Sequence, residues 1–233
     1  MATSDLALVR GLADTRATLD AWNERPWPVL GRWLAGAVLV TAVLLLATWI
    51  VAVRSVPDAS GLGFPGLRHP GDLDDVGRVL FRNGLVLALH AMACVAGFIA
   101  GSSLPQQAEE HSGIWRTIHE KAGPLAILFV VAATLFSLVT QAFVLGQGAS
   151  TLAWQLDISP ALLLVGLLPH ALPELIALFI PLAAWTIASR RGEWHELLAA
   201  TFVTVVIAVP VLIAAAFVEV YVSADVLKAL AGR

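Results

Sequence analysis

Five long apolar runs dominate this sequence of 233 residues. The hydrocarbon core of a bilayer is about 30 Å thick, and a helix needs roughly 20 apolar residues to cross it. Inside lipid, every backbone polar group must be satisfied within the chain, and an α-helix meets this condition by itself. We therefore predict an all-α fold, a polytopic transmembrane helix bundle of about five spans. The predicted spans cover approximately residues 33–53, 84–101, 123–146, 161–188 and 197–222.

The composition argues against a soluble domain. Hydrophobic residues make up 58% of the chain and charged residues only 13%, whereas about a quarter of a soluble domain is charged. The net charge of -3 is too small to indicate a nucleic-acid partner. The single cysteine, Cys94, cannot form an intramolecular disulfide.

The sequence divides into three parts: residues 1–28, 29–225 and 226–233. The first contains apolar side chains at about helical spacing, namely Leu8, Leu12, Leu19 and Trp22. This spacing is typical of an amphipathic helix at the membrane surface, and a short solvated helix is the alternative. The second part is the transmembrane domain, and the third is a short tail.

The distribution of Lys and Arg gives the orientation. Residues 147–160 carry neither, whereas Arg190 and Arg191 follow the fourth run. Because positive residues are enriched in cytoplasmic segments, we predict a multi-pass protein with a cytoplasmic N-terminus. Five spans then place the C-terminus outside.

The fourth run contains two prolines, Pro169 and Pro173, within 28 residues that would extend about 42 Å as a straight helix. Each proline removes a backbone donor and clashes with the preceding turn. We therefore predict a helix that is broken or kinked at these positions. Irregular backbone at membrane depth survives only within protein or beside a watery cavity, so this segment should face the interior of the bundle.

Ionisable and amide side chains occur within or at the ends of four runs. A charge at the bilayer centre is costly, so we expect Glu174 to be neutral or hydrogen-bonded to His170. The predicted topology places six such residues in the same half of the membrane, where we expect one buried polar centre. They are Asn83, His90, Gln141, His170, Glu174 and Glu219.

Three interpretations of this polar centre remain open. Each group could satisfy a neighbouring side chain or a free carbonyl, the centre could bind a substrate or relay protons, or it could bind a metal. Pro173 lies between His170 and Glu174 and spoils their i,i+4 geometry as ligands. The sequence contains no HExxH motif, phosphate loop or Ser/His/Asp order. We therefore assign no catalytic residue, no metal site and no cofactor.

Gly97 and Gly101 form a GxxxG pair in the second run. Small residues at this spacing allow helices to approach closely. Packing within the chain and packing in a dimer both explain the pair.

Three stretches resemble the stage II sporulation protein M family of integral membrane proteins. The first is Phe81-Arg82-Asn83-Gly84 followed by the span that ends Gly97-Phe98-Ile99-Ala100-Gly101, the second is Leu168-Pro169-His170-Ala171-Leu172-Pro173-Glu174-Leu175-Ile176-Ala177, and the third is Ala216-Phe217-Val218-Glu219-Val220-Tyr221-Val222. The resemblance covers approximately residues 78–225. Two features depart from the family: Ala171 stands where a glycine is frequent, and no proline follows Glu219.

The resemblance implies a polytopic protein of the cytoplasmic membrane that is not an enzyme. It favours a scaffold that assembles other membrane or envelope proteins, and the alternative is a membrane subunit of a transporter or exporter. The expected partners are the lipid bilayer and such proteins, with an ABC-type ATPase in the transport case. We expect no nucleic-acid partner, and a homo-oligomer remains open.

Overall fold

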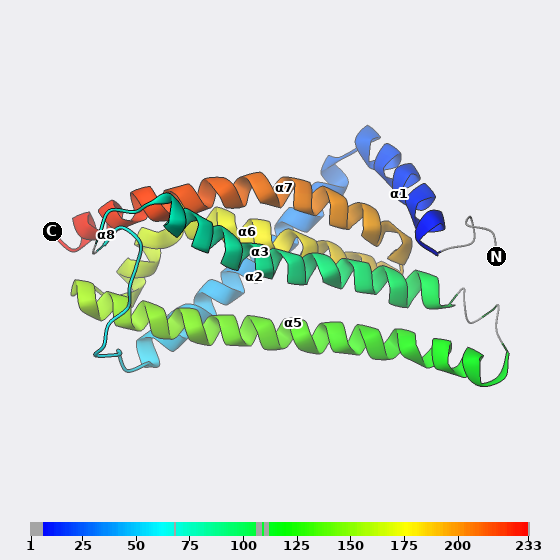
Figure 1. Ribbon diagram of the computed structural model, residues 1–233, viewed down its shortest axis with the longest axis horizontal. Helices are drawn as coiled ribbons and strands as arrows, with labels where there is room; N and C mark the ends of the chain where they lie inside the picture. Colours follow the sequence, from blue (N-terminus) through cyan, green and yellow to red (C-terminus); the bar gives the residue numbers. More distant parts are fainter. Residues whose placement is uncertain (1–6, 68, 106–108, 110–111, 233) are drawn as a thin grey trace. The chain divides into compact units, whose positions relative to one another are not determined.

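The computed structural model describes residues 7–67, 69–105, 109 and 112–232. This part of the chain is helical and contains no strand, which confirms the predicted all-α class (Figure 1). The long helices are α1 (Ala7–Glu24), α2 (Trp27–Arg54), α3 (Leu73–Phe98), α5 (Gly113–Leu156), α6 (Pro160–Arg191) and α7 (Leu197–Val218). The short elements are η2 (Ile99–Ser103), η3 (Trp194–Glu196), η4 (Glu219–Ser223) and α8 (Ala224–Leu230).

Five helical segments of the described chain are long and apolar enough to cross a membrane, as predicted. Their bounds are Trp27–Arg54, Leu73–Ser103, Gly113–Leu156, Pro160–Arg191 and Trp194–Leu230. The second span is α3 continued by the π-helical η2, and the fifth is η3, α7, η4 and α8 in succession. Each span is longer than its apolar run, because polar residues at the ends continue the helix.

The chain forms two compact units. Unit 1 comprises Met1–Ala37, Leu87–Thr134 and Leu178–Ile207, and unit 2 comprises Val38–Val86, Leu135–Ala177 and Ala208–Arg233. All five spans therefore contribute residues to both units.

Unit 1 includes the N-terminal helix α1, which confirms that a helix forms in residues 1–28. Gly11 of α1 lies against Phe98 and Leu198, where a Cβ would come within 2.8 and 2.9 Å of their side chains. Trp22 of α1 packs edge-on against Trp33 of α2, with ring centroids 5.1 Å apart. Helix α1 is thus packed on the rest of its unit, and its position at a membrane surface remains a prediction.

The GxxxG pair of the sequence also packs within unit 1. A Cβ on Gly97 would come within 2.7 Å of Trp185 Nε1. A Cβ on Gly101 would come within 2.1 Å of Trp194 Cδ2. Packing within the chain therefore accounts for these two glycines.

Unit 2 has an apolar core of its own. Leu163 of α6 and Leu227 of α8 are fully buried there with Leu152 and Leu156 of α5. Phe64, from the loop between α2 and α3, packs on this cluster. Part of the predicted tail, residues 226–230, thus belongs to α8 and contributes to the core.

The predicted break in the fourth span does not form. Helix α6 is assigned as one continuous α-helix through Pro169 and Pro173. Ser159 caps its start, since its Oγ accepts a hydrogen bond from the N–H of Leu162 at 3.1 Å, and Pro160 occupies the first helical position, which suits proline. Because each proline removes only one N–H, the rest of the hydrogen-bond ladder persists. The kink remains a prediction.

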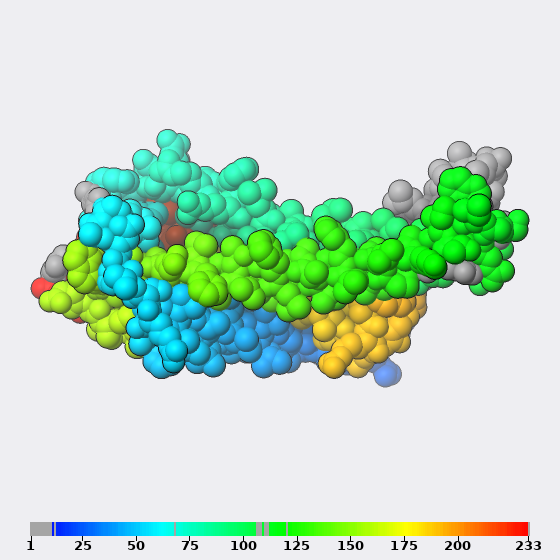
Figure 2. Space-filling model, turned by 90° about the horizontal axis from the view of Figure 1, so that it is seen from below, coloured from blue at the N-terminus to red at the C-terminus, as the bar shows by residue number. Residues whose placement is uncertain are grey.

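The third span continues through the segment that we expected to be a connection. Helix α5 extends to Leu156, so most of residues 147–160 is helical. Its polar side chains find partners beyond the helix. Ser150 Oγ donates to the carbonyl of Ser55 at 3.1 Å, and Thr151 Oγ1 accepts from the N–H of Asp58 at 3.0 Å. These contacts anchor the first connecting loop, residues 55–67 and 69–72, which lies along the last turns of α5 (Figure 2).

Candidate functional site

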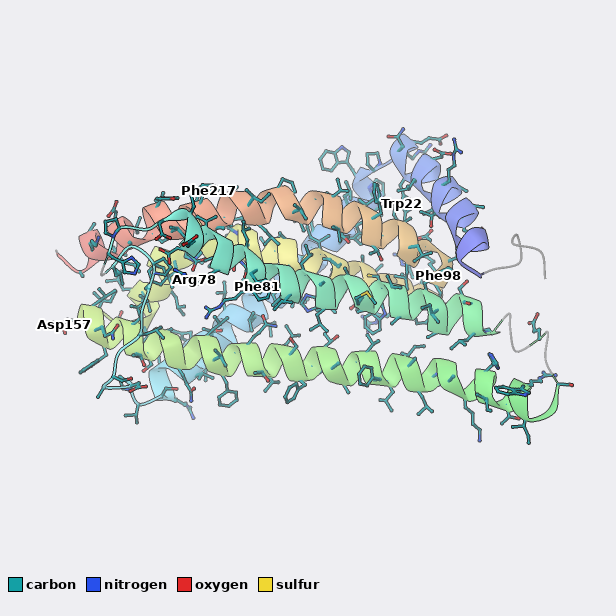
Figure 3. All side chains as sticks on the ribbon, viewed as in Figure 1. Trp22, Arg78, Phe81, Phe98, Asp157 and Phe217 are labelled. Atoms are coloured by element: carbon teal, nitrogen blue, oxygen red, sulfur yellow. The ribbon has the colours of Figure 1, made fainter. Side chains whose placement is uncertain are left out.

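Three elements of unit 2 supply the polar site: α3, α6 and η4. Figure 3 shows the start of α3, where Arg78 and Phe81 are labelled, and Arg82 and Asn83 follow on the same helix. Helix α6 carries His170 and Glu174 one turn apart. Element η4, here called the π-turn, begins with Glu219 and ends with Ser223.

His170 is bonded to the π-turn. Its Nδ1 lies 2.7 Å from Ser223 Oγ, and both side chains are buried, with 6% and 1% exposure. Ser223 Oγ donates in turn to the carbonyl of Val218, 3.2 Å away. The direction of the His170–Ser223 bond depends on the tautomer of the imidazole, and in either direction the bond joins α6 to the π-turn.

Glu174 interacts with two neighbours rather than with His170. Its carboxyl lies within electrostatic range of Glu219 and close to the Asn83 amide. The structure describes both Glu174 and His170, and no hydrogen bond joins them, since the contact of His170 is with Ser223. Of the two alternatives expected for Glu174, the neutral carboxyl therefore stays a prediction.

Two polar atoms of this group, Oε2 of Glu174 and Nδ2 of Asn83, are buried without a hydrogen bond of standard geometry among the described residues. The Glu174 carboxyl and the Asn83 amide nevertheless interact with each other. Glu219 interacts with the guanidinium of Arg82, whose side chain is exposed. The site therefore contains two carboxyl groups, one nearby cation and unused hydrogen-bonding capacity. Such a set of side chains can bind a proton, a small cation or a hydrogen-bond donor.

The structure places His90 in unit 1 rather than with this group. Its Nδ1 lies 3.0 Å from the carbonyl of Leu178, and its ring packs on Phe179 with centroids 5.4 Å apart. The imidazole is fully buried, and its Nε2 has no partner in the described chain. These contacts make His90 a link between α3 and α6 within unit 1.

Gln141 lies in unit 2, on α5. Its Nε2 donates to Ser137 Oγ at 3.0 Å, one turn earlier on the same helix. This bond satisfies part of the amide locally. Of the six residues predicted to converge, the structure thus brings together Asn83, Glu174 and Glu219, with His170 attached to the same π-turn.

Sequence reasoning missed Arg82 and Ser223. Arg82 precedes Asn83 directly, and its position beside an intramembrane amide was a usable signal. Ser223 carried no signal, because a serine near a span end is common. The π-turn is likewise not visible in the sequence, although such turns are frequent at functional sites.

The described residues contain no group of three or more His, Cys, Asp and Glu side chains placed to hold a metal ion. Two carboxyl groups alone fall short of the three or four ligands of a zinc site.

Comparisons with known proteins agree with the resemblance noted in the sequence. The stage II sporulation protein M family matches residues 122–224. This range includes the stretch around His170 and Glu174 and the stretch around Glu219, while Phe81–Gly84 lies before it. No curated protein and no solved structure matches the chain. Over residues 122–224, which hold most of the polar site, the chain is similar to the stage II sporulation protein M family.

Proposed function

We propose that the protein is a non-enzymatic membrane scaffold that assembles other membrane or envelope proteins. The polar site would serve it by fixing the π-turn, and the π-turn would in turn support the surface that partners contact.

The observation that carries this proposal is the packing on both sides of the π-turn. His170 of α6 binds Ser223 on one side. On the other, Gly71 of the first connecting loop approaches so closely that a Cβ there would lie 2.6 Å from Val220 Cγ1. Gly66 of the same loop lies against Ala224, just beyond the π-turn. The position of this loop therefore depends on the π-turn, which His170 holds through Ser223.

Further contacts fix this loop in place. Lys228 Nζ of α8 donates to the Gly66 carbonyl at 3.0 Å. The loop exposes apolar residues, with Val56 91% and Leu62 40% exposed. An ordered loop outside the spans with exposed apolar side chains fits a protein-contact surface.

The test is recovery of partners with the tagged full-length protein in mild detergent. We expect His170→Ala to lower thermal stability and the yield of co-purifying membrane proteins together, because both depend on the π-turn. Val56→Ser should lower the yield of co-purifying proteins without lowering thermal stability, since the Val56 side chain is exposed. The proposal fails if both variants stay folded and retain every partner.

A transport role is the second candidate, and the unpartnered atoms of Glu174 and Asn83 favour it. Unused buried donors and acceptors are costly unless a ligand or proton occupies them at some stage. In this case the protein would catalyse a flux in liposomes that Glu174→Gln abolishes. An unchanged flux in that variant, or none for a panel of solutes, would count against it.

A further inference from the structure

Unit 1 contains two adjoining hollows that no part of the proposed function uses. The first, here called the charged pocket, has a volume of about 90 Å³ and is lined by Trp22, Arg32, Trp33, Arg191, Glu193 and Glu196 among others. The second, the apolar groove, has a volume of about 390 Å³ and includes Leu19, Trp22, Pro26, Val29, Leu30 and Val203. Trp22 and Val29 belong to both linings.

The charged pocket presents two cations and two anions that are weakly engaged. Arg191 and Glu193 approach only to 4.0 Å, and their side chains are 43% and 38% exposed. Such exposed pairs contribute little to stability. Arg32 donates from Nε to the Pro28 carbonyl of its own helix. Glu196 interacts electrostatically with Arg191 and Arg32 without a close ion pair among the described residues. The charges therefore face one another across the pocket, where a ligand with both a cation and an anion fits between them.

The pocket lies where three spans end. Arg32 and Trp33 are near the start of α2, Arg191 is the last residue of α6, and Glu193 and Glu196 flank the start of the fifth span. Tryptophan is enriched at the level of the lipid headgroups. Trp22, labelled in Figure 3, reaches this place from α1 and packs on Trp33.

We propose that the charged pocket and the apolar groove together bind one phospholipid whose headgroup carries a phosphate and a primary ammonium. The guanidinium groups of Arg32 and Arg191 suit the phosphate, because their planar donors match its oxygens. The carboxylates of Glu193 and Glu196 accept hydrogen bonds from the ammonium. The apolar groove, which shares Trp22 and Val29 with the pocket, takes an acyl chain.

This arrangement predicts a specific choice among headgroups. Phosphatidylglycerol offers the phosphate without a cation, so the two carboxylates would repel it or remain unpaired. Phosphatidylcholine carries a cation without N–H donors and with three bulky methyl groups. Phosphatidylethanolamine offers both a phosphate for the two guanidinium groups and an ammonium with N–H donors for the two carboxylates.

The experiment is native mass spectrometry of the full-length protein in detergent, titrated with these three lipids of identical acyl chains. We expect the wild-type protein to bind phosphatidylethanolamine about tenfold more tightly than either alternative, equivalent to about 1.4 kcal/mol. Arg191→Gln and Glu196→Gln should each reduce that preference severalfold. Arg190→Gln is the matched control, since Arg190 is exposed and outside the pocket lining, and it should leave the preference unchanged.

Equal binding of the three lipids by the wild-type protein would overturn the proposal. This comparison uses the wild-type protein only, so it does not depend on the folding of any variant. So would an Arg190→Gln effect as large as that of Arg191→Gln, which would indicate unspecific attraction. The result is independent of the scaffold proposal, because partner recovery depends on unit 2 residues and lipid choice on unit 1 residues.

Discussion

Ser223 and Ser189 both place their hydroxyl oxygen inside the protein, but only one of them has a partner. Ser223 Oγ lies 2.7 Å from His170 Nδ1 and 3.2 Å from the Val218 carbonyl. Ser189 Oγ is buried with no hydrogen-bond partner among the described residues. A buried polar atom that loses its partner costs free energy, whereas removing an unpartnered one does not. The same substitution at the two positions therefore separates pairing from burial.

We expect Ser223→Ala to lower the free energy of unfolding by about 0.5–2 kcal/mol, the range for hydrogen bonds in membrane proteins. The loss arises because His170 Nδ1 then stays buried without its hydrogen-bond partner. Ser189→Ala should be neutral or slightly stabilising. Thermal unfolding in detergent measures both, and equal losses in the two variants would contradict the proposed role of the His170 contact.

Asp58 gives a pH-dependent prediction outside the spans. The Ser60 backbone N–H donates to Asp58 Oδ1 at 2.9 Å, and this bond holds the pKa of the carboxyl below its ordinary value of 3.8. A carboxyl whose pKa is depressed by folding stabilises the fold above its unfolded pKa. That contribution is lost as the pH falls through the folded pKa. The turn at the start of the first connecting loop should therefore loosen only in strong acid.

An NMR titration of the Asp58 carboxyl carbon measures this pKa directly. Ser60→Ala keeps the backbone donor, so the pKa should stay below 3.8. Ser60→Pro removes the N–H, and the pKa should rise towards the ordinary value. An ordinary pKa in the wild-type protein would show that the turn does not form in solution.

At the residue scale, the sequence identifies the ionisable groups of the polar site but not the residues that they contact. Glu174, Glu219 and Asn83 stand out because polar side chains are rare in apolar runs. Ser223 does not, since its importance depends on the π-turn that turns its hydroxyl towards α6. That turn packs against Gly66, Gly71 and α6, and no local pattern encodes these contacts.

At the scale of the elements, the five spans were predictable because each apolar run is long enough by itself. Their ends were not, because polar residues such as Ser150 and Thr151 continue α5 by bonding to a distant loop. The break predicted at the prolines of α6 does not form, because a helix packed against its neighbours can stay continuous with two donors missing.

The packing of η2 on Trp194 gives an element-scale prediction. A Cβ on Gly101 would lie 2.1 Å from Trp194 Cδ2, so either the ring or the helix must move. We expect Gly101→Ala to lower the free energy of unfolding by about 1–3 kcal/mol, the usual cost of overpacking. Gly84 is the matched control on the same span, since no atom of the described residues lies within 4 Å of its Cβ position.

Gly84→Ala should be neutral or stabilising by up to about 1 kcal/mol, because alanine favours a helix over glycine. Unfolding by SDS or heat compares the two variants. If Gly101→Ala is as stable as Gly84→Ala, the close approach of η2 to Trp194 is wrong.

For the whole molecule, five crossings require the two ends of the chain to lie on opposite sides of the membrane. The described chain contains five helical segments long and apolar enough to span it. Cysteine labelling tests this count. Cys94 is fully buried and donates to the Pro181 carbonyl, so Cys94→Ser keeps a donor and gives a background without thiols.

Single cysteines then replace exposed or terminal residues: Ala13, Val56, Ser112 and Ala231. With a cytoplasmic N-terminus, an impermeant maleimide added to intact cells should label positions 56 and 231. Positions 13 and 112 should react only after the membrane is opened. Two crossings separate them, so they lie on the same side, whereas an odd number of crossings separates each of them from positions 56 and 231. Identical labelling at positions 13 and 231 would exclude an odd number of spans. Labelling of positions 13 and 112 alone in intact cells would agree with five spans but reverse the orientation that Arg190 and Arg191 predict.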